Sequence, residues 1–330
     1  MHYPIYSKNK YICFLLGLLL TGGCSSFQNG FLGFAPLGDK QEYVRARDSY
    51  NAKKYNDAVQ ELTQYIYKAG NVKRREARAY RLLGMSYEQL NQPGKALETY
   101  LEALEFHPHN EALLLAAAGL YQRTGLIDKS QLLYERVLKQ DPQNLKALAG
   151  QAENYRTFGF FSQARKYYDD FFRLNPSASP QYRAQYASTF LNQGNFEQAF
   201  IHITMALSED PYQPDYWLTS AKASFGLERF EDALAAINTA TMLAPGRTDL
   251  QLYKIMGLYQ TNHYKHALEA AIEFTKAHPD SQLGWLLVAL SEQAQNQTKS
   301  ARIHLRKATD LDATSFTGKV AAKLLQEWKQ

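Results

Sequence analysis

The stretch YRLLGMSY, residues 80–87, followed by ALETYLEALEFHP, residues 96–108, decides the fold of this chain. Its apolar residues recur at helical spacings of three and four, and the second segment ends on a proline. Prolines then recur at positions 108, 142, 176, 211, 245 and 279, at intervals of 34, 34, 35, 34 and 34 residues. A fixed period of this length predicts a structural repeat, and the longer interval spans the loop PSASP at 176–180.

Three kinds of position recur within the period, and each has a packing reason. A small residue in the first helix of a unit lets the second helix approach closely: Gly84, Ala118, Ala152, Ala187, Ala221 and Ala289. A second small residue lies opposite it on the other helix of the unit: Ala58, Ala96, Ser130, Ala164, Ala199, Ala233, Ala267 and Ala301. One turn later a large side chain fills the space between units: Leu62, Tyr100, Tyr134, Tyr168, Ile203, Ile237 and Leu305.

This pattern resembles the tetratricopeptide repeat. The resemblance implies an all-α, right-handed α-solenoid of about eight helix-turn-helix repeats over residues 39–313, with first helices starting near 39, 77, 111, 145, 180, 214, 248 and 282. The seventh unit diverges, because Ile255 stands where a small residue is expected and Ala271 where a large one is. Residues 314–330 place four apolar side chains on one helical face and predict a capping helix at the open end of the solenoid.

The first residues predict export from the cytoplasm. Lys8 and Lys10 precede the apolar run YICFLLGLLL, which is shorter than a membrane-spanning helix needs, and small residues follow it. The sequence LTGGC at 20–24 resembles the lipobox of bacterial lipoproteins, which implies a signal peptide at 1–23 and acylation of Cys24. The alternative is an uncleaved N-terminal anchor.

The mature chain would then begin at Cys24 and be held on a membrane by its lipids. Ser25 follows the cysteine, and by resemblance to Gram-negative lipoproteins this favours the periplasmic face of the outer membrane. Residues 24–38 mix Gly, Ser, Pro and Phe without a helical period and predict a lipidated flexible tether. A tether that docks on the first helices is the alternative. Cys13 lies in the removed segment, so no internal disulfide is expected.

Composition and motifs exclude several function classes. Hydrophobic residues make up 45% of the chain and charged residues 21%, as in folded domains. The formal net charge is +5, or +3 without Lys8 and Lys10, which is too small an excess to indicate nucleic-acid binding. The sequence contains no phosphate-binding loop, dinucleotide motif, zinc-protease motif or nucleophile elbow. We therefore expect neither catalysis nor a cofactor.

Two histidine pairs, at 107 and 109 and at 263 and 266, are the only candidates for metal ligands. The first pair lies in a repeat turn, where position 107 corresponds to residues of varied chemistry in the other units. The second pair lies on an exposed helix and has no cysteine close in sequence to complete a zinc site. We expect no metal site.

Function is expected on the concave face, which the first helices line in this family. Charged positions with a basic excess come from the early repeats: Arg78, Arg81, Arg123, Lys146 and Arg156. Apolar positions come from the late repeats: Leu218, Phe225, Leu252, Met256, Tyr259, Leu286 and Leu290. The first set predicts a polar trough and the second an apolar trough for a helix or an extended peptide. The alternatives are a solvated charged face and an apolar face covered by a tight superhelix or by the terminal helix.

These observations predict a non-catalytic scaffold that binds other proteins and is anchored to the bacterial outer membrane. Acylated repeat proteins of this build resemble the pilus-assembly lipoproteins, the pilotins of type IV pili and their counterpart in the tight-adherence system. The resemblance implies secretin or pilus components as partners. Two alternatives remain: an adaptor for peptidoglycan enzymes or outer-membrane protein insertion, and a polysaccharide-export component that stacks sugars on Phe225 and Tyr259.

Overall fold

The structure is a computed structural model that describes residues 37–68 and 76–328. Within these residues the chain forms seventeen α-helices and no strand. Sixteen helices form eight consecutive pairs, each joined by a turn of three residues, and one helix follows the last pair. The predicted N-terminal features up to residue 36, Cys24 included, lie outside the described residues. The last two residues of the predicted tether, 37 and 38, belong to the first helix, which therefore starts earlier than expected.

The helices have the following bounds. The first four pairs are α1 (Leu37–Asn51) with α2 (Tyr55–Lys68), α3 (Ala77–Gln89) with α4 (Pro93–Phe106), α5 (Glu111–Arg123) with α6 (Ile127–Gln140), and α7 (Leu145–Thr157) with α8 (Phe161–Leu174). The next four are α9 (Pro180–Asn192) with α10 (Phe196–Glu209), α11 (Pro214–Gly226) with α12 (Phe230–Leu243), α13 (Thr248–Gln260) with α14 (Tyr264–Ala277), and α15 (Gln282–Ala294) with α16 (Thr298–Leu311). The last helix is α17 (Phe316–Glu327).

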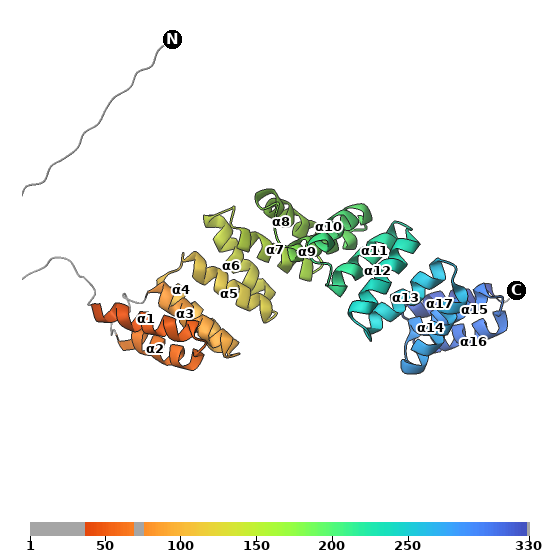
Figure 1. Ribbon diagram of the computed structural model, residues 1–330, viewed down its shortest axis with the longest axis horizontal. Helices are drawn as coiled ribbons and strands as arrows, with labels where there is room; N and C mark the ends of the chain where they lie inside the picture. Colours follow the sequence, from red (N-terminus) through yellow and green to blue (C-terminus); the bar gives the residue numbers. More distant parts are fainter. Residues whose placement is uncertain (1–36, 69–75, 329–330) are drawn as a thin grey trace, which may run out of the picture.

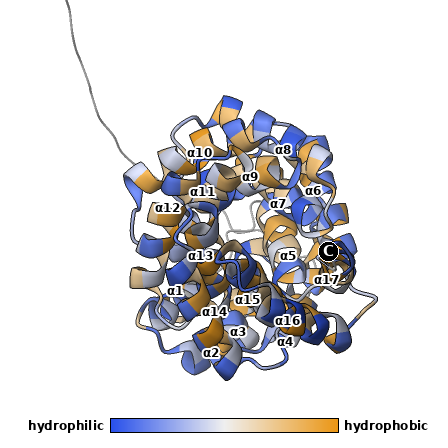
Figure 2. Cartoon of the chain, turned by 90° about the vertical axis from the view of Figure 1, so that its right-hand side faces the viewer, coloured by the Kyte–Doolittle hydropathy of each residue, from blue (hydrophilic) through white to orange (hydrophobic). Residues whose placement is uncertain are grey.

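The predicted starts of seven first helices coincide with the observed ones, and the remaining first helix begins at 37 rather than near 39. The pairs follow one another along a single axis, with α1 and α2 at one end and α15 to α17 at the other (Figure 1). Contacts between pairs join neighbours in the sequence. Seen along the axis, the pairs follow a ring with α5, α7, α9 and α11 on its inner side (Figure 2). The chain is an all-α solenoid whose first helices form the concave face.

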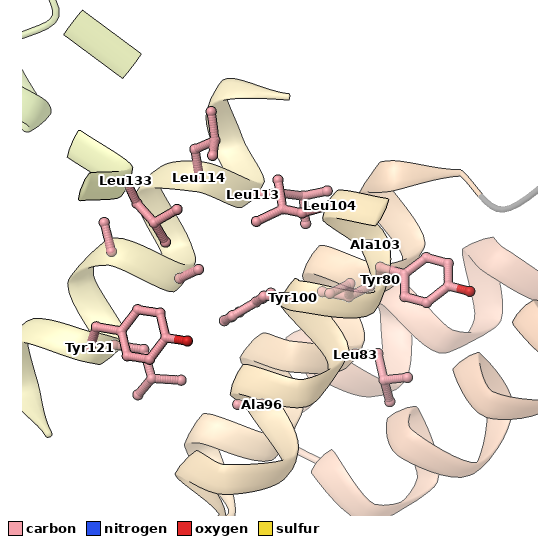
Figure 3. Close-up of a cluster of buried hydrophobic side chains, with 14 of the residues drawn as sticks. Tyr80, Leu83, Ala96, Tyr100, Ala103, Leu104, Leu113, Leu114, Tyr121 and Leu133 are labelled. Atoms are coloured by element: carbon pink, nitrogen blue, oxygen red, sulfur yellow. The ribbon is translucent and has the colours of Figure 1, made fainter. Parts of the chain in front are cut away.

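The core consists of small and large residues at the positions that the period predicts. Every predicted small residue of the second helices is fully buried, and the predicted large residues are at most 5% exposed. Tyr100 lies in the middle of one such cluster, between Tyr80 and Leu83 of its own pair and Leu113 and Tyr121 of the next (Figure 3). Packing between pairs therefore holds the described chain together.

The divergent seventh unit keeps its place by exchanging bulk between two positions. Ile255, on the first helix, and Ala271, on the second, are both buried in one cluster with Phe274, Leu287 and Val288. In this unit the larger of the two side chains, Ile255, is on the first helix and not on the second. The interface is filled from α13 instead of from α14, which is why a unit that breaks the pattern still fits the solenoid.

The turn inside every pair has the same backbone shape. Its middle residue has a positive φ in all eight turns: Lys53, Asn91, Gly125, Gly159, Gly194, Glu228, Asn262 and Asn296. This shared geometry makes the turns equivalent positions, so their flanking side chains can be compared directly between units.

Candidate functional site

A hollow of about 370 Å³ lies on the concave face where the third, fourth and fifth units meet. Three first helices line it, with one residue from α6: Leu115 and Gln122 from α5, Tyr134 from α6, Lys146, Ala149, Gly150 and Glu153 from α7, and Gln181, Tyr182 and Gln185 from α9. Because consecutive first helices stand side by side, positions one repeat apart in sequence become neighbours here. A ligand in the hollow would contact three repeats at once.

Hydrogen bonds fix one side of the hollow. Gln122 donates through Nε2 to Oδ1 of Asn154 at 2.8 Å and to the carbonyl oxygen of Gly150 at 3.2 Å. Asn154 is fully buried and donates through Nδ2 to Oγ of Ser130 at 2.9 Å. Burial raises the pKa of Tyr134 to about 12, so this lining side chain stays neutral at physiological pH. The network joins α5, α6 and α7 and holds this side of the site rigid.

The charges that face the hollow are unequal. Glu153 accepts hydrogen bonds of 2.7 Å and 2.6 Å from Nε and Nη2 of Arg156, so its charge is balanced. These bonds also raise the pKa of Arg156. Lys146 is exposed, and the described residues contain no ion pair that includes it. With the amides of Gln181 and Gln185 nearby, the hollow offers donors and a positive charge to carbonyl or carboxylate groups.

The predicted basic trough is partly neutralised. Three of its arginines are paired: Arg78 with Glu76, Arg123 with Glu88, and Arg156 with Glu153. Arg78 also lies over the ring of Tyr43, with its guanidinium carbon 4.6 Å from the ring centre. Arg81 and Lys146 are exposed. Lys146 is thus the one residue of this predicted set that lines the hollow.

The predicted apolar trough includes core residues. Leu218 and Leu286 are each 6% exposed and pack inside hydrophobic clusters, so they hold helices together and are not available to a partner. The other five predicted residues are half-buried: Phe225, Leu252, Met256, Tyr259 and Leu290. Leu286 is buried because α16 and α17 both pack near it, which the helical position alone does not reveal.

Helix α17 covers the end of the solenoid, away from the hollow. Val320, Leu324, Leu325 and Trp328 pack against the cluster formed by α15 and α16. Ser315 caps the helix by accepting from the backbone N–H of Gly318 and donates to Oε1 of Gln282 at 2.6 Å. The terminal helix therefore takes the place of a further repeat, and the half-buried side chain of Leu290 lies beside it.

The lining residues that the sequence analysis missed include Gln181, Tyr182 and Gln185. They come from the fifth unit, whose inward positions were left out of the polar trough. Arg78 and Lys146 are the second residues of α3 and α7, and the equivalent second residue of α9 is Gln181. Tyr182 and Gln185 lie at other positions of α9, and Oε1 of Gln185 accepts a hydrogen bond of 3.3 Å from the hydroxyl of the buried Tyr168.

Within the described residues, no group of three or more His, Cys, Asp and Glu side chains is arranged to hold a metal ion. No helix within residues 37–68 and 76–328 is long and apolar enough to cross a membrane.

Family models of the tetratricopeptide repeat match residues 77–110 and 150–214. These segments are tetratricopeptide repeats, and the helix pairs of the same size before, between and after them give the described chain the architecture of a tetratricopeptide repeat protein. Repeats of this kind generally form scaffolds for protein–protein interaction.

Curated relatives share part of the chain. Tetratricopeptide repeat protein 8 of Caenorhabditis elegans is 31% identical over 140 residues, which is 42% of this chain and 28% of the relative. BBSome complex member BBS4 of Bos taurus is 22% identical over 237 residues, or 70% of this chain and 44% of the relative. The chain thus spans less than half the length of these relatives.

Solved structures share the fold. A tetratricopeptide repeat protein from Parabacteroides merdae superposes with a TM-score of 0.55 at 17% identity, covering 88% of this chain and 99% of that one. PilW, described as a type IV pilus biogenesis factor, gives 0.54 at 18% identity over 63% of this chain and 96% of its own. PilF of Pseudomonas aeruginosa gives 0.54 at 17% identity, with 65% and 97% covered. At these identities the similarity shows the fold alone.

Proposed function

We propose that this protein is a non-catalytic scaffold that binds a segment of another protein on its concave face and assists the assembly of a pilus or secretion complex at the bacterial outer membrane. The observation that carries the binding part is the hollow across α5, α7 and α9. It is lined by amides, tyrosines and one unbalanced lysine, which suit the backbone and acidic groups of an extended segment.

The proposed role in assembly is supported by two other observations. Two solved structures with the same fold, PilW and PilF, match this chain over nearly their whole length. The first is described as a type IV pilus biogenesis factor. The sequence LTGGC at 20–24 adds the lipoprotein resemblance. Together they favour an envelope assembly role over a cytoplasmic one.

The binding site can be tested by site-specific photocrosslinking in native envelopes. A photoreactive amino acid at Lys146, inside the hollow, should capture the partner, whereas the same group at Lys139, an exposed residue of the outer helix α6, should not. A secretin or pilus subunit crosslinked at Lys146 supports the proposal. Crosslinks that form only at Lys139 contradict a concave binding site.

The same experiment separates the alternative functions. Peptidoglycan enzymes or outer-membrane insertion machinery captured at Lys146 would keep the binding site and replace the pilus role with the adaptor role. A carbohydrate-export role predicts instead that a polysaccharide competes with crosslinking at Phe225 or Tyr259, the half-buried aromatic residues predicted for sugar stacking.

The membrane anchor has its own test, because Cys24 lies outside the described residues. Cys24→Ala should release the protein from the membrane fraction and abolish incorporation of a labelled fatty acid. Membrane sedimentation that is unchanged in this variant would favour the uncleaved N-terminal helix.

A further inference from the structure

Two neighbouring turns carry exposed apolar side chains at a position that is polar in the other six. The residue after the positive-φ residue is Leu126 in the third unit and Phe160 in the fourth. The equivalent residues elsewhere are Lys54, Gln92, Asn195, Arg229, His263 and Gln297. Phe158, on the other side of Gly159, is exposed as well. Leu126, Phe158 and Phe160 are 45%, 46% and 53% exposed, and we name them the aromatic edge.

The two turns lie beside each other. The hydrogen bond from Gln122 to Asn154, 2.8 Å long, joins the last turns of α5 and α7, from which the two loops continue. The three apolar side chains therefore belong to one stretch of the solenoid rim and are not scattered single residues.

Ring contacts hold the exposed side chains in place. Phe160 lies 6.4 Å from Phe158 and 6.4 Å from Tyr155, measured between ring centres, and both pairs are edge-on. Tyr155 in turn stacks on Tyr167 at 5.5 Å. The positive φ of Gly159, 77°, places the two phenylalanines on either side of a tight turn. The rings are presented outward on a supported turn.

The surroundings of the aromatic edge are basic. Residues 121–130 and 155–166 contain five basic side chains, Arg123, Lys129, Arg156, Arg165 and Lys166, and one acidic side chain, Asp128. Arg123 and Arg156 are balanced by carboxylates of the concave face, and Arg165 has a carboxylate of Asp169 at 4.0 Å. Lys129 and Lys166 remain exposed beside the turns. Together with Asp128, which is also exposed, these two lysines leave one positive charge in excess near the apolar tips.

We propose that the aromatic edge inserts into the interface of an anionic lipid bilayer. The apolar tips are on turns and not in a hollow, so the partner must supply a yielding apolar layer into which they can sink. Phenylalanine and leucine side chains can bury at the boundary between headgroups and acyl chains, and lysines near them attract anionic headgroups. This contact goes beyond the proposed function: it is a second membrane contact within the folded solenoid, and it does not need acylation of Cys24.

The test places a fluorescent reporter at the edge of the full chain. Phe160→Trp is compared with Arg229→Trp, which has the same place in the turn of the sixth unit, and with the parent chain to account for Trp217, Trp285 and Trp328. The probes are vesicles of phosphatidylcholine and phosphatidylglycerol with brominated chains. We expect the emission of the tryptophan at 160 to shift to shorter wavelengths and to be quenched, while that of the tryptophan at 229 is unchanged.

Charge dependence completes the test. Quenching at 160 should be lost on vesicles of phosphatidylcholine alone, and Lys129→Ala with Lys166→Ala should weaken the interaction about thirtyfold. A reporter at 160 that stays in water with the anionic vesicles overturns the proposal, as does one that becomes shielded only in a protein complex. If Phe160→Trp loses helicity by circular dichroism, Phe158→Trp serves as the reporter with the same expected result.

Discussion

A Cβ atom on Gly84 would lie 2.2 Å from Cε1 of Tyr100, far inside van der Waals contact. The tyrosine ring, fully buried on α4, occupies the space above the glycine on α3. Its hydroxyl donates to Oε1 of Glu88 at 2.6 Å, so the ring is held at both ends. The ring of Tyr100 therefore requires glycine at position 84, in addition to the general need for a small residue where two helices pack closely.

Gly84→Ala should lower the free energy of unfolding by about 1–3 kcal/mol, since the buried ring of Tyr100 cannot move aside without disturbing its neighbours. Equilibrium unfolding in urea measures the change. Gly94→Ala is the matched control, because no atom lies within 4 Å of the added Cβ at this position in α4. The control should be neutral or more stable by up to about 1 kcal/mol. Equal effects of the two substitutions would contradict the steric explanation.

The buried carboxylate of Glu292 leads to a second prediction. It is 4% exposed and accepts hydrogen bonds from Oγ of Ser300 at 2.5 Å and from Nδ1 of His304 at 2.8 Å. The ring of His304 also stacks on Trp285, with centres 5.3 Å apart. His304→Phe keeps a ring for the stack and removes one donor, so it should cost about 2 kcal/mol of stability.

Urea unfolding of a double-mutant cycle checks this result. In a Glu292→Leu background the phenylalanine at 304 should cost much less, because no buried acceptor is left without its donor. If His304→Phe destabilises both backgrounds equally, the loss comes from ring packing and the hydrogen bond contributes little.

The period predicted the architecture because each repeat solves the same packing problem. Proline spacing and the alternation of small and large residues located the helix pairs, since a solenoid unit contacts only its neighbours. Ile255 and Ala271 show the limit of this pattern. The sequence alone does not tell that a large residue at 255 and a small one at 271 fit together, because this depends on their packing in one cluster with Phe274.

The site was predicted less well, for two physical reasons. Whether a side chain on the inner face is open depends on which helix packs over it. Leu286 lies in one buried cluster with residues of α17, which follow it by more than thirty positions in the sequence. Charge on a groove depends on pairing, and Arg123 is balanced by Glu88 from the preceding repeat. The sequence alone predicts which side chains point toward the inner face. Whether those side chains are exposed, and whether their charges are balanced, depends on how the neighbouring repeats pack.

His202 makes stability depend on pH. Its ring packs beside the rings of Tyr186 and Phe190. Desolvation by burial, with a smaller contribution from the charge of Arg183, lowers the pKa of His202, and Asp169 opposes this weakly. In the unfolded chain His202 has an ordinary pKa near 6.5, so His202 binds a proton more readily there than in the folded chain. The stability associated with neutral His202 is complete above pH of about 6.5 and is lost as the pH falls below it.

Urea unfolding at pH of about 7.5 and about 5.5 checks the sign. His202→Phe keeps the stacking surface and cannot titrate, so its stability should fall less between the two pH values than that of the parent. The same fall in both proteins would assign the pH dependence to groups other than His202.

The last prediction concerns the cap. Ala321 is fully buried where α17 meets the last pair, whereas Lys323, two residues further on, is exposed. Ala321→Glu places a charge in that interface and should detach α17, because a carboxylate without a partner is too costly to bury there. Lys323→Glu should leave the helix in place. With α17 detached, the cluster around Leu305 is open to solvent, and the chain should melt at a lower temperature and associate with itself, as solenoids with an uncapped end do. Thermal unfolding and analytical ultracentrifugation measure the two effects. A monomeric Ala321→Glu protein with the stability of the Lys323→Glu control would show that α17 is dispensable and that the eight helix pairs are stable without a cap.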